Sequence, residues 1–205
     1  RVEIHDVGSI ALGAPVVAAS RYEASMRSAV NAYKERQVLA LGPALGGLLA
    51  LSLRAVAPEQ HRIDVVRIPA HRASTRRRGH DSLGSIVRLA ARHLRDNGVH
   101  LVDHDLIARS SDAGRQVGRS AAERQRVVQG SMFVRSLPIW PAHDGPASRP
   151  TSVIVVDDVV TSGATIGEAG RALRAAGITV IAGAAIAGTP RRVDRRGLRA
   201  PTGPW

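Results

Sequence analysis

The sequence contains no cysteine and very few aromatic residues. Among its 205 residues are two Trp, two Tyr and one Phe. Without thiols the chain forms no disulfide, binds no Cys-ligated zinc and has no thiol nucleophile. The shortage of aromatic rings leaves few platforms on which single-stranded bases could stack. The lack of cysteine fits a reducing compartment, and we expect a cytoplasmic protein.

Long apolar runs are also missing. The longest stretch without a charged residue extends from Gln37 to Leu53 and is interrupted by glycine and proline. A bilayer-spanning helix needs about 20 predominantly apolar residues. We therefore expect no membrane span. The first residues also lack the basic region, apolar core and cleavage site of a signal peptide.

Acidic residues are outnumbered by basic ones. The chain has 17 Asp and Glu against 29 Lys and Arg, which gives a formal net charge of +12. Most of these cations are Arg, whose planar guanidinium stays charged and matches phosphate oxygens. The charge predicts anionic partners, with single-stranded DNA among the candidates. A coding bias that favours Arg and Ala throughout the chain is the alternative explanation.

The hydrophobic pattern predicts an α/β protein. Apolar residues make up 44% of the chain, enough for a packed core. The pattern is helical from about Tyr22 to Leu53, and strand-like from Ile63 to Ile68. Amphipathic spacing then predicts a helix from Leu83 that ends near Gly98. The segment from Ser110 to Ser120 is polar and is expected to be mobile.

The clearest unit follows near the C-terminus. Ser152 to Val156 is a continuous apolar run typical of a strand buried on both faces. Helical spacing follows from Ile166 to Ala176, and another apolar run extends from Ile178 to Ala187. Strand, helix and strand in this order indicate a βαβ crossover. We therefore predict an open, mainly parallel sheet with helices on both faces.

Three parts are expected along the chain. Residues 1–55 are predicted to form a helical N-terminal segment packed on the core. Residues 56–189 form the α/β domain, and residues 190–205 form a basic, flexible tail.

The candidate site lies between the predicted strand and helix of the βαβ unit. Asp157 and Asp158 are followed by Val160, Thr161, Ser162, Gly163, Ala164 and Thr165. Ligands of parallel sheets bind beyond the carboxyl ends of the strands. The amides at a helix N-terminus attract an anion, and two carboxylates suit sugar hydroxyls or a metal-bound water. This combination predicts a site for a phosphorylated sugar.

Two alternatives apply to this loop. Asp158 or Thr161 could simply cap the helix, a role that Asp and Thr often have. A Walker phosphate loop would need Gly-Lys-Ser or Gly-Lys-Thr, which the loop lacks. Glu168, in the predicted helix, is expected to face solvent.

The stretch Val155 to Thr165 resembles the phosphoribosyl pyrophosphate motif of type I phosphoribosyltransferases. Other stretches resemble the ComF family in particular, which is linked to DNA uptake. They are Tyr22-Glu23, Lys34-Glu35, Ile68-Pro69-Ala70-His71-Arg72, Arg78-Gly79, Arg109 with Gln116, and Glu123-Arg124. Members of that family usually begin with a cysteine zinc ribbon, whose ligands are absent here.

The resemblance implies a role for each matching residue. Asp157 and Asp158 would bind the ribose hydroxyls, and residues 160–165 would hold the 5′-phosphate. Ala70, His71 and Arg72 would face the pyrophosphate. Arg109 and Gln116 belong to the segment that would close over the substrate, and Arg109 is expected to be catalytic with the two aspartates.

The expected reaction is displacement of pyrophosphate from the ribose by an unidentified nucleophile. Mg²⁺ would be bound through phosphoribosyl pyrophosphate, and no metal site made of protein ligands is expected. The competing hypothesis is a non-enzymatic ComF-type protein that binds single-stranded DNA and uses the pocket as a ligand sensor. A homodimer is compatible with either hypothesis.

Overall fold

The computed structural model describes residues 5–7, 11–57, 59–70, 79, 81–110, 130–135 and 150–189. Its elements in chain order are β1 (His5–Asp6), β2 (Val16–Arg21), α1 (Ala24–Glu35), the 3₁₀ turn η1 (Leu39–Leu41), α2 (Gly42–Val56), β3 (Arg62–Arg67), α4 (Ser82–Arg95), β4 (His100–His104), β5 (Ile107–Arg109), β6 (Met132–Val134), β7 (Ser152–Val160), α6 (Ala164–Ala175) and β8 (Thr179–Gly188).

Six strands form one sheet in the order β1-β2-β8-β7-β3-β4. The pairs β2–β8, β8–β7, β7–β3 and β3–β4 are parallel, and β1 is an antiparallel edge strand. A separate antiparallel pair joins β5 to β6. The predicted α/β fold with a mainly parallel sheet is therefore confirmed.

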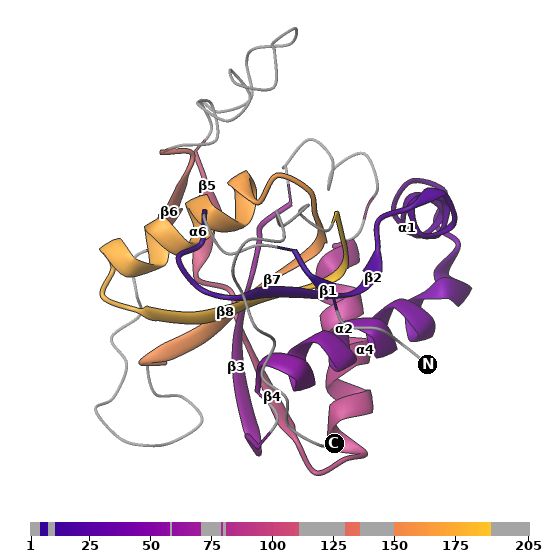
Figure 1. Ribbon diagram of the computed structural model, residues 1–205, viewed down its shortest axis with the longest axis horizontal. Coiled ribbons are helices and arrows are strands. Elements are labelled where there is room, and N and C mark those ends of the chain that lie inside the picture. Colours follow the sequence, from indigo (N-terminus) through magenta and orange to yellow (C-terminus); the bar gives the residue numbers. More distant parts are fainter. Residues whose placement is uncertain are drawn as a thin grey trace, which may run out of the picture.

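Helices cover both faces of the sheet. Helix α6 lies on one face and helices α2 and α4 lie on the other (Figure 1). Alternate residues of β7 supply both cores: Val153 and Val155 pack on the α6 side, and Ile154 and Val156 on the α2–α4 side. This two-sided burial explains why the strand reads as a continuous apolar run.

The N-terminal segment differs from the prediction. Residues 1–55 were expected to be helical, but residues 16–21 form β2, which pairs in parallel with β8. Val16 and Ala18 of this strand are fully buried. Its partner lies far away in the sequence, so the local pattern of small and apolar residues was insufficient to identify the strand. The proposed division into three parts stays a prediction.

Helix α2 is the most apolar helix. Among the described residues, Leu39–Val56 is the one stretch long and apolar enough, by composition, to cross a membrane. In this fold Leu45, Leu49 and Leu53 are almost completely buried in the core with α4 and the sheet. A core helix satisfies the same compositional criterion, and α2 occupies that position.

Candidate functional site

The candidate site lies at the point in the sheet from which the strand connections run in opposite directions. The β3–α4–β4 connection covers one face, whereas the β7–α6–β8 connection covers the other. Strands β3 and β7 are adjacent, so the carboxyl ends of these two strands form the crevice in which open α/β sheets bind ligands. The Ile68 amide donates to the Val156 carbonyl at 2.9 Å, which brings the residues after β3 beside Asp157.

The acidic pair lies on the strand rather than in a loop. Strand β7 extends to Val160 because β8 continues to pair with it, with Asp157 opposite Ala185 and Val160 opposite Gly188. The prediction that the strand ends at Val156 is therefore wrong by four residues. Successive strand residues point to opposite faces, so the two carboxylates have different surroundings.

Asp158 forms an ion pair with a lysine from the N-terminal part of the chain. The Lys34 ammonium, at the end of α1, lies 2.6 Å from Asp158 Oδ2. The two side chains are only 26% and 13% exposed. Lys34 is part of the ComF resemblance, which implies no role for it. Its contact with the site depends on the packing of α1.

Asp157 interacts with a different cation. Its Oδ1 accepts the Asp158 amide at 2.8 Å, and the Arg109 guanidinium is near enough to interact with it electrostatically. Burial, followed by repulsion from Asp158, raises the pKa of Asp157 to about 8. Lys34 and Arg109 oppose this increase. Without a ligand, Asp157 therefore holds a proton over much of the neutral range.

Arg109 connects the acidic pair to the residues after β3. Its Nε donates to the Pro69 carbonyl at 2.8 Å, directly before Ala70. Burial lowers the pKa of Arg109, and the neighbouring Asp157 partly offsets this effect. Arg109 and Ala70 are thus brought to the same edge of the sheet as the acidic pair. His71, Arg72 and Gln116, the other predicted ligands, lie outside the described residues.

The two ends of the connection from β3 to α4 are held by ion pairs. Arg67, the last residue of β3, contacts Asp103 of β4 at 2.6 Å and also Asp81. Asp81 caps α4 through the Gly84 amide at 3.0 Å. These contacts anchor the beginning of α4 beside the carboxyl end of β3.

The turn after β7 has the geometry of an anion site. Gly163 precedes α6 with φ of 74°, a left-handed conformation that glycine adopts without strain. The amides of the first helical turn have no intrahelical acceptor, although Ser162 Oγ accepts one of them, from Ala164, at 3.3 Å. A hollow of about 30 Å³ is lined by Asp157, Val159 and residues 160–166. Its size suits one small anion rather than a whole nucleotide.

The capping alternative is wrong for this helix. Gly163, which has no side chain, occupies the cap position, and the one side chain that accepts a first-turn amide in the described structure is Ser162, from Ala164. Asp158 instead pairs with Lys34. Thr161 and Ser162 are exposed around the turn, so their hydroxyls remain accessible to a ligand.

Comparison with known families agrees with this geometry. The family described as "phosphoribosyl transferase domain" matches residues 84–197, which is more than half of the chain and includes the acidic pair and the turn. The chain belongs to the phosphoribosyl transferase domain family. The match supports a transferase of that general kind but does not identify the ComF family in particular. No curated protein matches the chain.

Several features of this phosphoribosyl transferase domain were missed by sequence reasoning. The contact of Lys34 with Asp158 is one of them, and Lys34 lies outside the matched range. Pro69, whose carbonyl accepts from Arg109, lies outside that range too, as does Ala70, which was predicted. Glu168 was expected to face solvent but is 5% exposed. Its Oε1 accepts the Met132 amide at 3.1 Å, and it pairs with Arg171 at 2.8 Å. This contact anchors β6 to α6, and the only sequence signal for it was the Glu-x-x-Arg spacing.

Proposed function

We propose that the protein binds phosphoribosyl pyrophosphate with Mg²⁺ and transfers the phosphoribosyl group to a nucleophile with release of pyrophosphate. The observation that carries the proposal is the arrangement at the end of β7. Two carboxylates lie next to a turn where Gly163 precedes a helix whose first amides have no intrahelical acceptor. A sugar phosphate needs hydroxyl acceptors and an anion cradle side by side.

Each site residue that the structure describes has a role in this proposal. The turn of residues 161–165 holds the 5′-phosphate, and Asp157 and Asp158 accept hydrogen bonds from the ribose hydroxyls. Arg109 Nε donates to the Pro69 carbonyl, and in this proposal its terminal N–H groups donate to the pyrophosphate. Lys34 pairs with Asp158 and limits the repulsion within the acidic pair.

In the reaction, the bond between the anomeric carbon and the pyrophosphate oxygen breaks and a bond to the nucleophile forms. Pyrophosphate leaves with the electron pair, and the nucleophile loses its proton. Positive charge develops on the ribose, next to the carboxylates, while negative charge grows on the leaving group, next to Arg109.

In this proposal Mg²⁺ is bound through the ligand, by the pyrophosphate and the ribose, rather than by a protein cage. Among the described residues, no group of three His, Cys, Asp or Glu side chains could hold a metal ion. Asp158 Oδ2 is engaged by Lys34 and Asp157 Oδ1 by the Asp158 amide. When bound with the substrate, Mg²⁺ would neutralise charge on the pyrophosphate oxygens.

Calorimetric titration with phosphoribosyl pyrophosphate and Mg²⁺ tests the binding step. We expect saturable binding by the full chain and at least a tenfold loss of affinity in Asp158→Ala, which is about 1.4 kcal/mol. Glu59→Ala is the charge-matched control, because Glu59 is exposed and lies outside the site. No binding by the unaltered chain, or equal binding by both variants, would refute the proposal. Pyrophosphate release with candidate nucleophiles then tests transfer.

A second candidate is binding of single-stranded DNA, favoured by the net charge of +12. Neutralised phosphates release counterions, so affinity should fall with salt with a log-log slope of about 0.7 per phosphate for single strands. Retention on a single-stranded DNA column that is independent of salt, or absent at moderate salt, would eliminate this candidate.

A further inference from the structure

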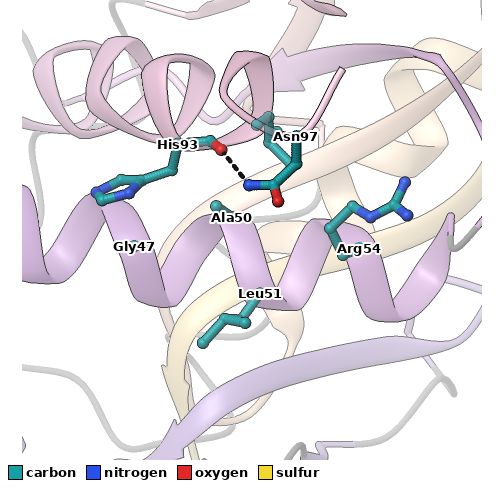
Figure 2. Close-up of a pocket in the computed structure, with 7 residues that line it drawn as sticks. Gly47, Ala50, Leu51, Arg54, His93 and Asn97 are labelled. Carbon is teal, nitrogen blue, oxygen red and sulfur yellow. Dashed lines mark hydrogen bonds between the residues drawn. The ribbon is translucent and has the colours of Figure 1, made fainter. Parts of the chain in front are cut away.

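A groove of about 530 Å³ lies between α2 and α4, and none of its lining residues belongs to the acidic pair or to the turn after β7. Gly47, Ala50, Leu51 and Arg54 of α2 line one side, and His93 and Asn97 line the other (Figure 2). Sites for small organic molecules typically have volumes of about 300–1,000 Å³.

The groove floor is open because α2 carries small residues there. Helix α2 has two consecutive glycines, and they differ in their surroundings. A Cβ on Gly46 would lie 2.6 Å from the Leu89 Cβ, so that glycine is required for the contact between the helices. A Cβ on Gly47 would meet only the His93 ring, at an ordinary 3.5 Å. Glycine within a helix is unfavourable, and helix packing does not explain Gly47.

Polar side chains also line this groove. The half-buried Arg54 donates from Nη1 to the Gln60 carbonyl at a long 3.3 Å, which leaves most of its N–H groups for a ligand. The Asn97 amide nitrogen donates to the His93 carbonyl at 2.9 Å, and its oxygen is directed into the gap between the helices (Figure 2). The groove therefore offers a cation and a hydrogen-bond acceptor.

Apart from the His93 ring, whose Nε2 lies 3.1 Å from the Pro43 carbonyl, the remaining lining is apolar. Leu51 forms one wall and is 44% exposed, although it is a large hydrophobic residue. Leu94 and Ala50 are buried beneath the groove. A complementary ligand has a flat apolar body over these residues, an anionic group for Arg54, and an N–H or O–H donor for Asn97.

From this chemistry we propose that the groove between α2 and α4 is a second binding site, for a small aromatic anion that carries a hydrogen-bond donor. The site is independent of the proposed transferase function, because it shares no residue with the acidic pair or the anion turn.

Anilinonaphthalene sulfonate is a suitable probe, because it combines two aromatic ring systems, one N–H and one sulfonate. The probe is titrated into a solution of the full chain, and its fluorescence is measured. The buffer contains about 150 mM salt, at which interactions between exposed charges are screened beyond about 8 Å. We expect one saturable site. Amide chemical shifts should move in residues 47–54 and 93–97. The uncharged phenylnaphthylamine should bind at least tenfold more weakly.

Matched variants assign the site. Arg54→Met should weaken the probe at least tenfold, whereas Arg92→Met, an equal loss of charge on the exposed surface of α4, should change affinity less than twofold. Gly47→Leu should abolish binding by filling the groove. Thermal melting of each variant checks that it is folded. Equal effects of the two arginine variants, retained binding in Gly47→Leu, or chemical-shift changes elsewhere would overturn the proposal.

Discussion

Asp157 and Asp158 are neighbours in the chain but differ in their electrostatic environment. Asp158 lies 2.6 Å from the Lys34 ammonium, whereas Asp157 is in the crevice with its pKa raised to about 8. A pair of this kind costs stability in the ligand-free protein, because one carboxyl is held where its charged form is disfavoured. The expected gain is a stronger interaction with a ligand that carries Mg²⁺ or develops positive charge.

Asp157→Asn should stabilise the ligand-free protein in a pH-dependent way. The folded state holds the proton on Asp157 up to about pH 8, whereas the unfolded chain releases it near its ordinary pKa of about 4. The free energy of unfolding of the unaltered protein therefore decreases as the pH rises from about 4 to about 8. The Asn variant has no carboxyl at this position and does not show this decrease. Melting curves should agree near pH 4 and differ by several degrees above pH 8, with the variant higher. If the melting temperatures of the two proteins showed the same pH dependence, the raised pKa assigned to Asp157 would be wrong.

Lys34→Met should weaken binding of phosphoribosyl pyrophosphate with Mg²⁺ about tenfold at pH 7 and shift its pH dependence upward. The Lys34 ammonium lowers the pKa of Asp157, so without it a higher pH is needed to ionise that carboxyl. Lys34→Arg keeps the charge and should stay within about threefold of the unaltered protein. Calorimetry across pH 6 to about 9 measures the shift. A loss of affinity without any shift in its pH dependence would indicate that Lys34 contributes through packing and not through its charge.

Helix α2 contains two adjacent glycines, Gly46 and Gly47, and only Gly46 lies in the close contact with α4. Gly46→Ala should destabilise the protein by about 1–3 kcal/mol, since its Cβ would lie 2.6 Å from the Leu89 Cβ and 3.1 Å from the Ala90 amide nitrogen. Gly47→Ala should instead stabilise it by about 0.5–1 kcal/mol through better helix propensity. Urea denaturation compares the two variants. Changes of the same sign would contradict the packing described here.

The β5–β6 pair is anchored to α6 by Glu168. Glu168→Ala should cost about 2–3 kcal/mol, because the buried Met132 amide and Arg171 lose an acceptor. Glu168→Gln keeps an acceptor for Met132 and should lose less. The Arg171 and backbone contacts lower the pKa of Glu168, so its contribution is present above about pH 4.5 and disappears as pH falls below it. Hydrogen exchange at Met132 checks the local effect, and unchanged exchange in the Ala variant would exclude the anchor.

The whole molecule is larger than the matched domain. Residues 84–197 contain β7, α6 and β8 but lack β2, α2 and β3. Without β3, which lies between β7 and β4, the sheet is divided. Without α2, the face that includes Ile154, Val156 and Ile186 loses its cover.

A fragment of residues 84–197 should therefore fail to fold on its own. Circular dichroism should detect no cooperative thermal transition, whereas a chain of residues 11–189, which keeps the central sheet and its helices, should melt cooperatively. A cooperative transition in the shorter fragment would show that the N-terminal elements are dispensable for folding.

Sequence reasoning was most accurate where structure depends on near neighbours. The apolar run 152–156, the helical spacing from Ile166 and the small residues around Gly163 predicted the βαβ unit and the position of the candidate site. Each pattern is local, since helix and strand periodicity and turn preference arise within a few residues. The same reasoning identified α4 from its amphipathic spacing.

The sequence by itself determined the parallel α/β core and the turn after β7, because short-range periodicity and backbone preference encode both. Only the tertiary structure decided that residues 16–21 join the sheet, that Lys34 reaches Asp158 and that Glu168 is buried. These contacts join segments from distant parts of the chain or depend on which helix face is covered. Their energies come from packing and desolvation in the assembled fold, which no local pattern records.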